Sequence, residues 1–85
     1  MIHAREDYQR IQDPEGKIPD DEPVFLIRGQ DVLGWEVVRC WATLNDRAGG
    51  DPALSKAARE HADKMEAWPV HKLADLPGSS EERPS

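Results

Sequence analysis

The chain has 85 residues, a formal net charge of −6 and a single cysteine. This length holds one domain with a small core, and one cysteine excludes an internal disulfide, which is typical of a reducing cytoplasm. Acidic surfaces repel phosphate backbones and anionic lipids, so we expect no direct nucleic-acid or membrane binding. The charge favours a basic protein partner, although acidity also serves solubility alone.

No stretch reaches the roughly 20 apolar residues of a membrane-spanning helix. The charged start "MIHAREDYQR" lacks the apolar stretch of a secretory signal, so we expect none.

The first 22 residues are predicted to form an N-terminal arm without a long helix. "DPEG" at residues 13–16 is a turn signal, and Pro19 disfavours a continuous helix. We expect Tyr8 and Ile11 to hold this arm against the rest of the domain.

An uninterrupted apolar run, "VFLI" at residues 24–27, follows the arm. Between Pro23 and Gly29, such a run predicts a strand buried on both sides. A strand needs hydrogen-bonding partners, so we expect it to pair with the arm, near residues 17–18, or with the same strand of another subunit. The alternative is an extended segment laid across the helices.

The next segment predicts a helix that begins at Asp31 or Gly34 and ends at Gly49-Gly50, where a glycine suits a left-handed cap. Its apolar stripe is broad, which indicates burial between neighbours or at an interface. We expect Trp41 in the core. The stripe comprises Leu33, Val37, Cys40, Trp41, Leu44 and Ala48, broadened by Trp35, Val38 and Ala42.

A second helix is predicted after Asp51, a good N-cap, with Pro52 in the first turn and Pro69 as its stop. One face is apolar and the other is charged. The charged face spaces Lys56/Glu60, Arg59/Asp63 and Glu60/Lys64 for ion pairs within the helix. The apolar face comprises Leu54, Ala57, Ala58, His61, Ala62, Met65 and Trp68.

Only "GGD" separates the two helices, so they should form an antiparallel hairpin. The sequence therefore predicts a small, mainly α single domain: an N-terminal arm (1–22), a compact helical-hairpin domain with one short strand or extended segment (23–76), and a disordered tail (77–85).

Residues that carry chemistry are sparse. His3, His61 and His71 do not stand at zinc-binding spacing, and the acidic residues match no calcium loop. There is also no phosphate-binding loop and no nucleophile elbow. We therefore expect no enzyme, no cofactor and no metal.

Partner-binding candidates come from charge and from aromatic residues, which are enriched at binding hot spots. Arg28 either fixes a local corner through an ion pair or recognises a partner. The tryptophans towards the helix ends either cover the core or anchor an interface. The candidates are Asp20, Asp21, Glu22, Arg28, Trp35 and Trp68.

The segment "DEPVFLIRGQD" followed by a Trp-bearing helix and "HADKMEAW" is similar to small uncharacterised proteins of tailed phages, prophages and proteobacteria. This resemblance covers most of the chain, from Tyr8 to Leu76. It transfers no activity and no site. It implies a context in which small accessory proteins bind host proteins, as anti-CRISPR and other anti-defence inhibitors do.

Two functions follow as hypotheses. The first is a non-enzymatic, cytoplasmic protein-binding module, in the form of an inhibitor whose acidic surface occludes a basic host protein. The alternative is a homo-oligomeric structural or assembly protein, such as a homodimer, whose apolar surfaces meet only copies of themselves.

Overall fold

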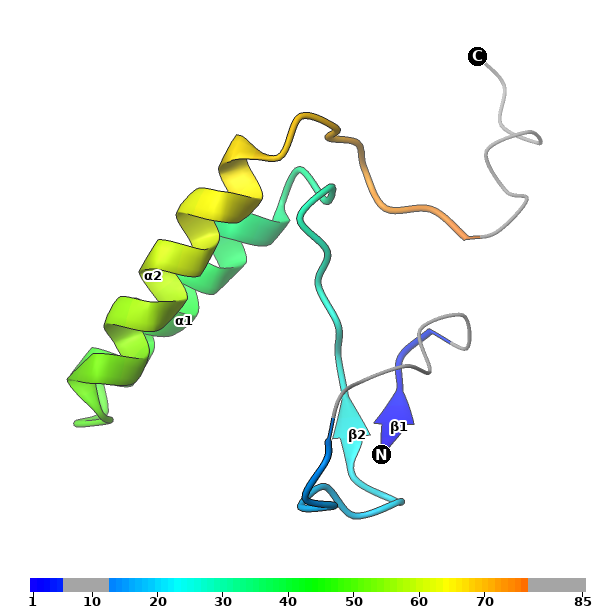
Figure 1. Cartoon of the computed structure of the whole chain (residues 1–85), viewed down its shortest axis with the longest axis vertical. Helices are drawn as coiled ribbons and strands as arrows, with labels where there is room; N and C mark the ends of the chain where they lie inside the picture. The colour runs from blue at the N-terminus through cyan, green and yellow to red at the C-terminus, as the bar shows by residue number, and fades with distance from the viewer. Residues whose placement is uncertain (6–12, 77–85) are drawn as a thin grey trace.

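The computed structural model describes residues 1–5 and 13–76. Its elements are β1 (Ile2–His3), β2 (Pro23–Val24), α1 (Gly34–Arg47) and α2 (Pro52–Ala67). The helices lie side by side as a hairpin, and the strands lie at the far end of a long connecting segment (Figure 1). This architecture confirms the predicted mainly α fold with a helical hairpin. Tyr8, Ile11 and the predicted tail lie outside the described residues.

Helix α2 begins as its sequence predicts. The Asp51 carboxylate accepts a hydrogen bond of 2.9 Å from the backbone N–H of Ala53, and Pro52 occupies the first turn, where a missing N–H costs nothing. The helix ends at Ala67, and Trp68 turns to extended backbone before Pro69. Both predicted boundaries are confirmed.

Helix α1 begins at Gly34, one of the two predicted starts. The other candidate, Asp31, precedes the helix, and its carboxylate accepts a 2.9 Å hydrogen bond from the N–H of Leu33. At the other end Gly49 has φ +79°, the left-handed conformation expected of a glycine after a helix. The chain then turns directly into α2.

Small side chains fill the centre of the hairpin. Ala42 and Ala62 are completely buried, Ser55 nearly so, and Met65 is the only large apolar side chain in the core of the described residues. Alanines let two helix backbones approach closely, which leaves the larger residues on the outside. The expectation that Trp41 is a core residue is therefore wrong, since 44% of its surface is exposed.

Ion pairs join the helices along one flank of the hairpin. Arg39 lies 2.8 Å from Asp63 and 2.7 Å from Glu66, and Arg59 lies 2.7 Å from Asp46. Arg59 and Asp63, predicted to pair within α2, thus each pair across the hairpin instead.

Of the other two predicted ion pairs, Lys56–Glu60 is present at 4.0 Å. The described residues show no Glu60–Lys64 bridge.

Strands β1 and β2 pair in parallel, with Ile2 opposite Pro23. The N–H of Ile2 donates to the carbonyl of Glu22 at 2.6 Å, and the N–H of Ala4 donates to Val24 at 3.3 Å. The prediction that this strand pairs with the N-terminal arm is therefore confirmed, but the predicted partner residues, 17–18, are wrong, since the partner is Ile2–His3.

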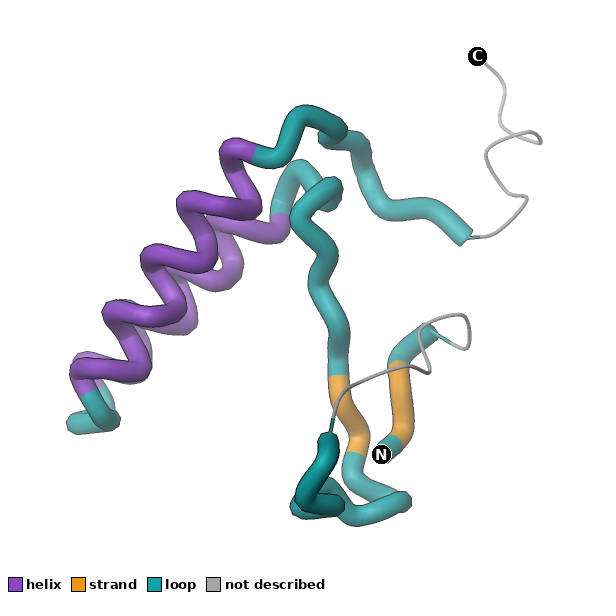
Figure 2. The backbone as a smooth tube through the Cα atoms, viewed as in Figure 1, coloured by secondary structure: helices purple, strands orange, loops and turns teal. Residues whose placement is uncertain are grey.

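The apolar run 24–27 is not the buried strand that the sequence suggested. Only Pro23–Val24 is strand, and the next residue, Phe25, is 69% exposed. The segment beyond it is extended, but it is not laid across the helices as the alternative interpretation proposed. Figure 2 shows it running from the strands up to the start of α1, so it reaches the hairpin only at one end. An isolated pair of two-residue strands has too few neighbours to cover these side chains.

This segment is held where it meets the hairpin. A Cβ built on Gly34 would lie 2.9 Å from Ile27 and 3.0 Å from the carbonyl of Arg28, so the backbones meet closely there. The chain after α2 adds two hydrogen bonds. The N–H of Lys72 donates to the carbonyl of Gln30 at 2.8 Å, and the N–H of Val32 donates to the carbonyl of Lys72 at 3.0 Å.

Within the described ranges, neither helix is long and apolar enough to cross a bilayer.

Candidate interaction surfaces

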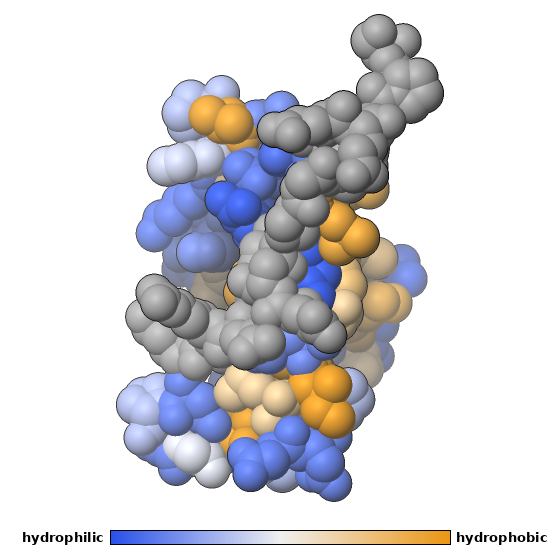
Figure 3. All heavy atoms as spheres, turned by 90° about the vertical axis from the view of Figure 1, so that its right-hand side faces the viewer, coloured by the Kyte–Doolittle hydropathy of each residue, from blue (hydrophilic) through white to orange (hydrophobic). Residues whose placement is uncertain are grey.

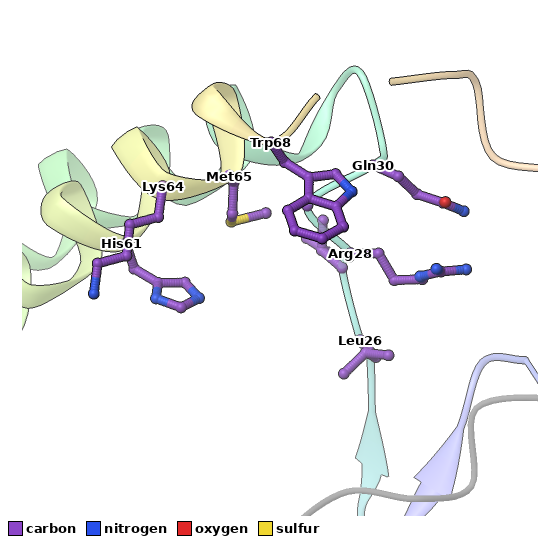
Figure 4. Close-up of a pocket in the computed structure, with 9 residues that line it drawn as sticks. Leu26, Arg28, Gln30, His61, Lys64, Met65 and Trp68 are labelled. Carbon is purple, nitrogen blue, oxygen red and sulfur yellow. The ribbon is translucent and has the colours of Figure 1, made fainter. Parts of the chain in front are cut away.

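An open groove of about 410 Å³ lies between the extended segment and the C-terminal half of α2. Apolar side chains of Leu26, Ile27, Met65 and Trp68 form much of its wall (Figure 4). The polar residues Arg28, Gln30, His61 and Lys64, together with Gly29, complete the lining. Grooves with apolar walls and a few polar groups are typical of binding sites for small molecules or partner side chains.

Trp68 is the most prominent side chain of this groove. It caps α2, where its N–H donates to the carbonyl of Met65 at 3.2 Å, and 54% of its surface is exposed. In Figure 4 its ring stands beside the extended segment, whereas Arg28 and Gln30 extend away from α2. Gly29 of the extended segment packs against the end of α2, since a Cβ built on it would be in ordinary contact with Met65 and Trp68 at 3.7 to 3.9 Å.

Trp35 occupies a different environment. Its ring centroid lies 4.7 Å from that of His71, and the His71 Nε2 lies 3.1 Å from the carbonyl oxygen of Met65. Trp35 is half-buried and joins the start of α1 to the chain that follows α2. This placement fits a tryptophan that covers the core rather than one that anchors an interface, the two roles that the sequence leaves open.

The acidic residues Asp20, Asp21 and Glu22 are all exposed in the turn that precedes β2. Figure 1 shows that turn at the strand end of the molecule, away from the C-terminal end of α2. Of the six partner-binding candidates, the structure therefore brings together Arg28 and Trp68 at the groove. The three acidic residues form a separate region.

A second hollow, of about 330 Å³, lies over the strands and is lined by Ile2, His3, Ala4, Pro23, Val24 and Phe25. Figure 3 shows apolar surface gathered at the lower end of this face with hydrophilic surface around it. Because Phe25 and Ile2 are both more than half exposed, this hollow is a shallow apolar patch.

The outward face of α1 carries apolar residues that the sequence pattern predicts to be buried, either between neighbouring elements or at an interface. Leu33, Val37, Trp41 and Leu44 are each between 44% and 54% exposed. These residues differ from the buried ones in side-chain size, since the helices touch through the small residues Ala42 and Ala62. Periodicity alone does not separate two apolar stripes on one helix.

Two pKa shifts mark the charged flank of the hairpin. The pKa of Arg39 is raised because its guanidinium donates hydrogen bonds to the carboxylates of Glu66 and, with a smaller effect, Asp63. Hydrogen bonds from Ser55 and then Arg59 lower the pKa of Asp46 below its ordinary value of 3.8. Both shifts arise from contacts between the helices, so this flank has a structural role.

Among residues 1–5 and 13–76, no three His, Cys, Asp or Glu side chains are grouped so that they could hold a metal ion. No protein-family model, no curated protein and no solved structure matches the chain.

Proposed function

We propose that this protein is a non-enzymatic protein-binding module whose groove at Trp68 receives an apolar side chain of its partner. The observation that supports it is that Trp68 and Leu26, both exposed, line the same open groove. A tryptophan that fills or walls a pocket at an interface is a frequent hot spot of binding energy.

The proposed partner is a protein with a basic surface. The chain carries a net charge of −6, and the acidic turn at residues 20–22 is exposed. In this proposal the acidic turn steers the partner and the groove anchors it, because charges on a rim mainly accelerate association while desolvated anchors slow dissociation. The resemblance to phage accessory proteins suggests an anti-defence inhibitor that occludes a host protein.

The test begins with affinity capture from a bacterial host lysate and then measures the captured protein against purified variants. Trp68→Ala should weaken binding at least about tenfold, the loss expected of a hot spot. The matched control is Leu73→Ala, which truncates another exposed apolar side chain outside the groove and should change affinity little.

The electrostatic part is tested separately with the triple variant D20K/D21K/E22K. It should lower the association rate, and added salt should lower the wild-type rate in the same way. Equal affinities of the Trp68→Ala and wild-type proteins would overturn the groove as the anchor. An association rate insensitive to both salt and charge reversal would overturn the basic partner.

A further inference from the structure

Helix α1 carries an apolar stripe on its far side from α2. Its residues follow one another at steps of four, four, three and four, and at 100° per residue they fall within an arc of about 80°. The stripe consists of Val37, Trp41 and Leu44 in the helix and of the flanking cap residues Leu33 and Ala48, all exposed. Buried Ala42, which faces α2, lies on a different side of the helix.

We infer that this stripe is the interface of a homodimer in which α1 packs antiparallel against α1 of a second copy, about a two-fold axis near Trp41. This inference goes beyond the proposed function, since it uses a surface separate from the Trp68 groove. A two-fold interface must be complementary to itself, so that residue i meets residue j and j meets i.

The charges along one edge of the stripe meet that requirement. Glu36 and Arg47 lie eleven residues apart, just over three full turns, and therefore on the same edge. They stand five residues before and six residues after Trp41. A two-fold axis at Trp41 therefore places Glu36 of each copy opposite Arg47 of the other. Both are exposed, and neither forms an ion pair within the described part of the chain.

This symmetry favours a second copy over an unrelated partner. A different protein would supply its own charges and would not require Glu36 and Arg47 to be nearly equidistant from the centre of the stripe. The 14 residues of α1 span about 21 Å, and one helix pair of that length buries less than the roughly 800 Å² per partner of a standard interface. We therefore expect a reversible dimer with a dissociation constant of about 1–100 μM.

Cys40 provides an internal probe of this arrangement. It is exposed, it is the only cysteine of the chain, and it neighbours Trp41. With the axis at Trp41, the two Cys40 residues of a dimer are offset by only about 3 Å along the helices. A short bifunctional maleimide should therefore link two copies through Cys40 at concentrations where the dimer forms, and Cys40→Ser should remove the product.

The experiment is sedimentation equilibrium of the full chain from 1 to 200 μM, with circular dichroism to verify that each variant is folded. The wild type should shift from monomer to dimer, and V37K/L44K should remain monomeric with unchanged helix content. E36R or R47E alone places like charges opposite each other twice per dimer and should weaken it about tenfold. The double variant E36R/R47E should restore association to within a few-fold of the wild type.

A wild-type monomer at 200 μM would overturn the inference, as would a dimer that V37K/L44K leaves intact. Failure of the double charge swap to restore association would overturn the two-fold antiparallel geometry. Each result is independent of the Trp68→Ala measurement, so failure of the dimer and failure of the proposed function are distinguishable.

Discussion

The hairpin and the arm are built by different means. The hairpin joins two helices through buried small residues and through ion pairs along one flank. The arm, together with the extended segment, depends on a two-residue strand pair, on the close approach at Gly34 and on backbone hydrogen bonds to Lys72. The comparison shows that one part is stabilised by side chains at helical spacing and the other by backbone contacts between distant residues.

The largest effect should come from a change at the centre of the hairpin. Ala62→Leu places a larger side chain where the helices touch, so it should lower the free energy of unfolding by about 1–3 kcal/mol. Urea denaturation measures the change. Ala57→Leu, on an exposed position of the same helix, is the matched control and should be nearly neutral. Equal effects of the two variants would contradict close packing at Ala62.

A smaller effect should follow where the arm meets the hairpin. Gly34→Ala adds a Cβ only 3.0 Å from the Arg28 carbonyl, so we expect a loss of about 1 kcal/mol, although alanine is intrinsically the better helix former. Amide hydrogen exchange should show faster exchange at Val32 and Lys72, with the middle of the helices unaffected.

Gly29→Ala is the control for that variant, since its Cβ meets only ordinary contacts at 3.7 Å or more. Unchanged exchange at Val32 in Gly34→Ala would contradict the close approach.

Acid should weaken the hairpin through Asp46. Its pKa is lower in the folded protein than its ordinary value of 3.8, so its contribution to stability is complete above that value and is lost as the pH falls through the folded pKa. Asp46→Asn should therefore reduce stability at pH 7 and flatten the pH dependence below about pH 4. Thermal unfolding at a series of pH values measures both, and parallel curves for the variant and the wild type would refute the assignment.

The smallest effect should come from Arg39. Arg39→Met keeps much of the aliphatic stem but removes both ion pairs with Asp63 and Glu66, so the unfolding temperature should fall slightly at low salt and less at 1 M NaCl. Lys56→Met removes only a 4.0 Å pair between exposed side chains and should change less. An Arg39 effect that does not depend on salt would point to packing by its stem instead.

The features of the fold that the sequence predicts correctly are those determined by residues close together in the chain. The start of α2 at Asp51-Pro52 and the glycine end of α1 follow from local backbone chemistry, and the hairpin follows from the short turn. For β2, the sequence predicts a partner strand in the N-terminal arm but not which residues form it. The pairing of Ile2 with Pro23 joins distant residues through backbone N–H and C=O groups, which every residue except proline carries in full, so no side-chain pattern marks it.

The candidate surfaces were predictable to a similar degree. Trp68 was identified from its place at a helix end, and it lies in the groove. The apolar stripe that Trp41 shares with other residues at helical spacing predicts a core position for it. The structure instead packs the helices through Ala42, and the sequence does not state which of two apolar stripes on α1 will face α2.

The parallel pairing of β1 with β2 has a consequence for the order in which the chain folds. The hairpin needs only contacts between helices joined by a short turn, so little entropy is lost in closing it. The strand pair closes a loop of about 20 residues for a few backbone hydrogen bonds. The hairpin should therefore form in the rate-determining step, and the strand pair should form afterwards as a late, readily reversible event.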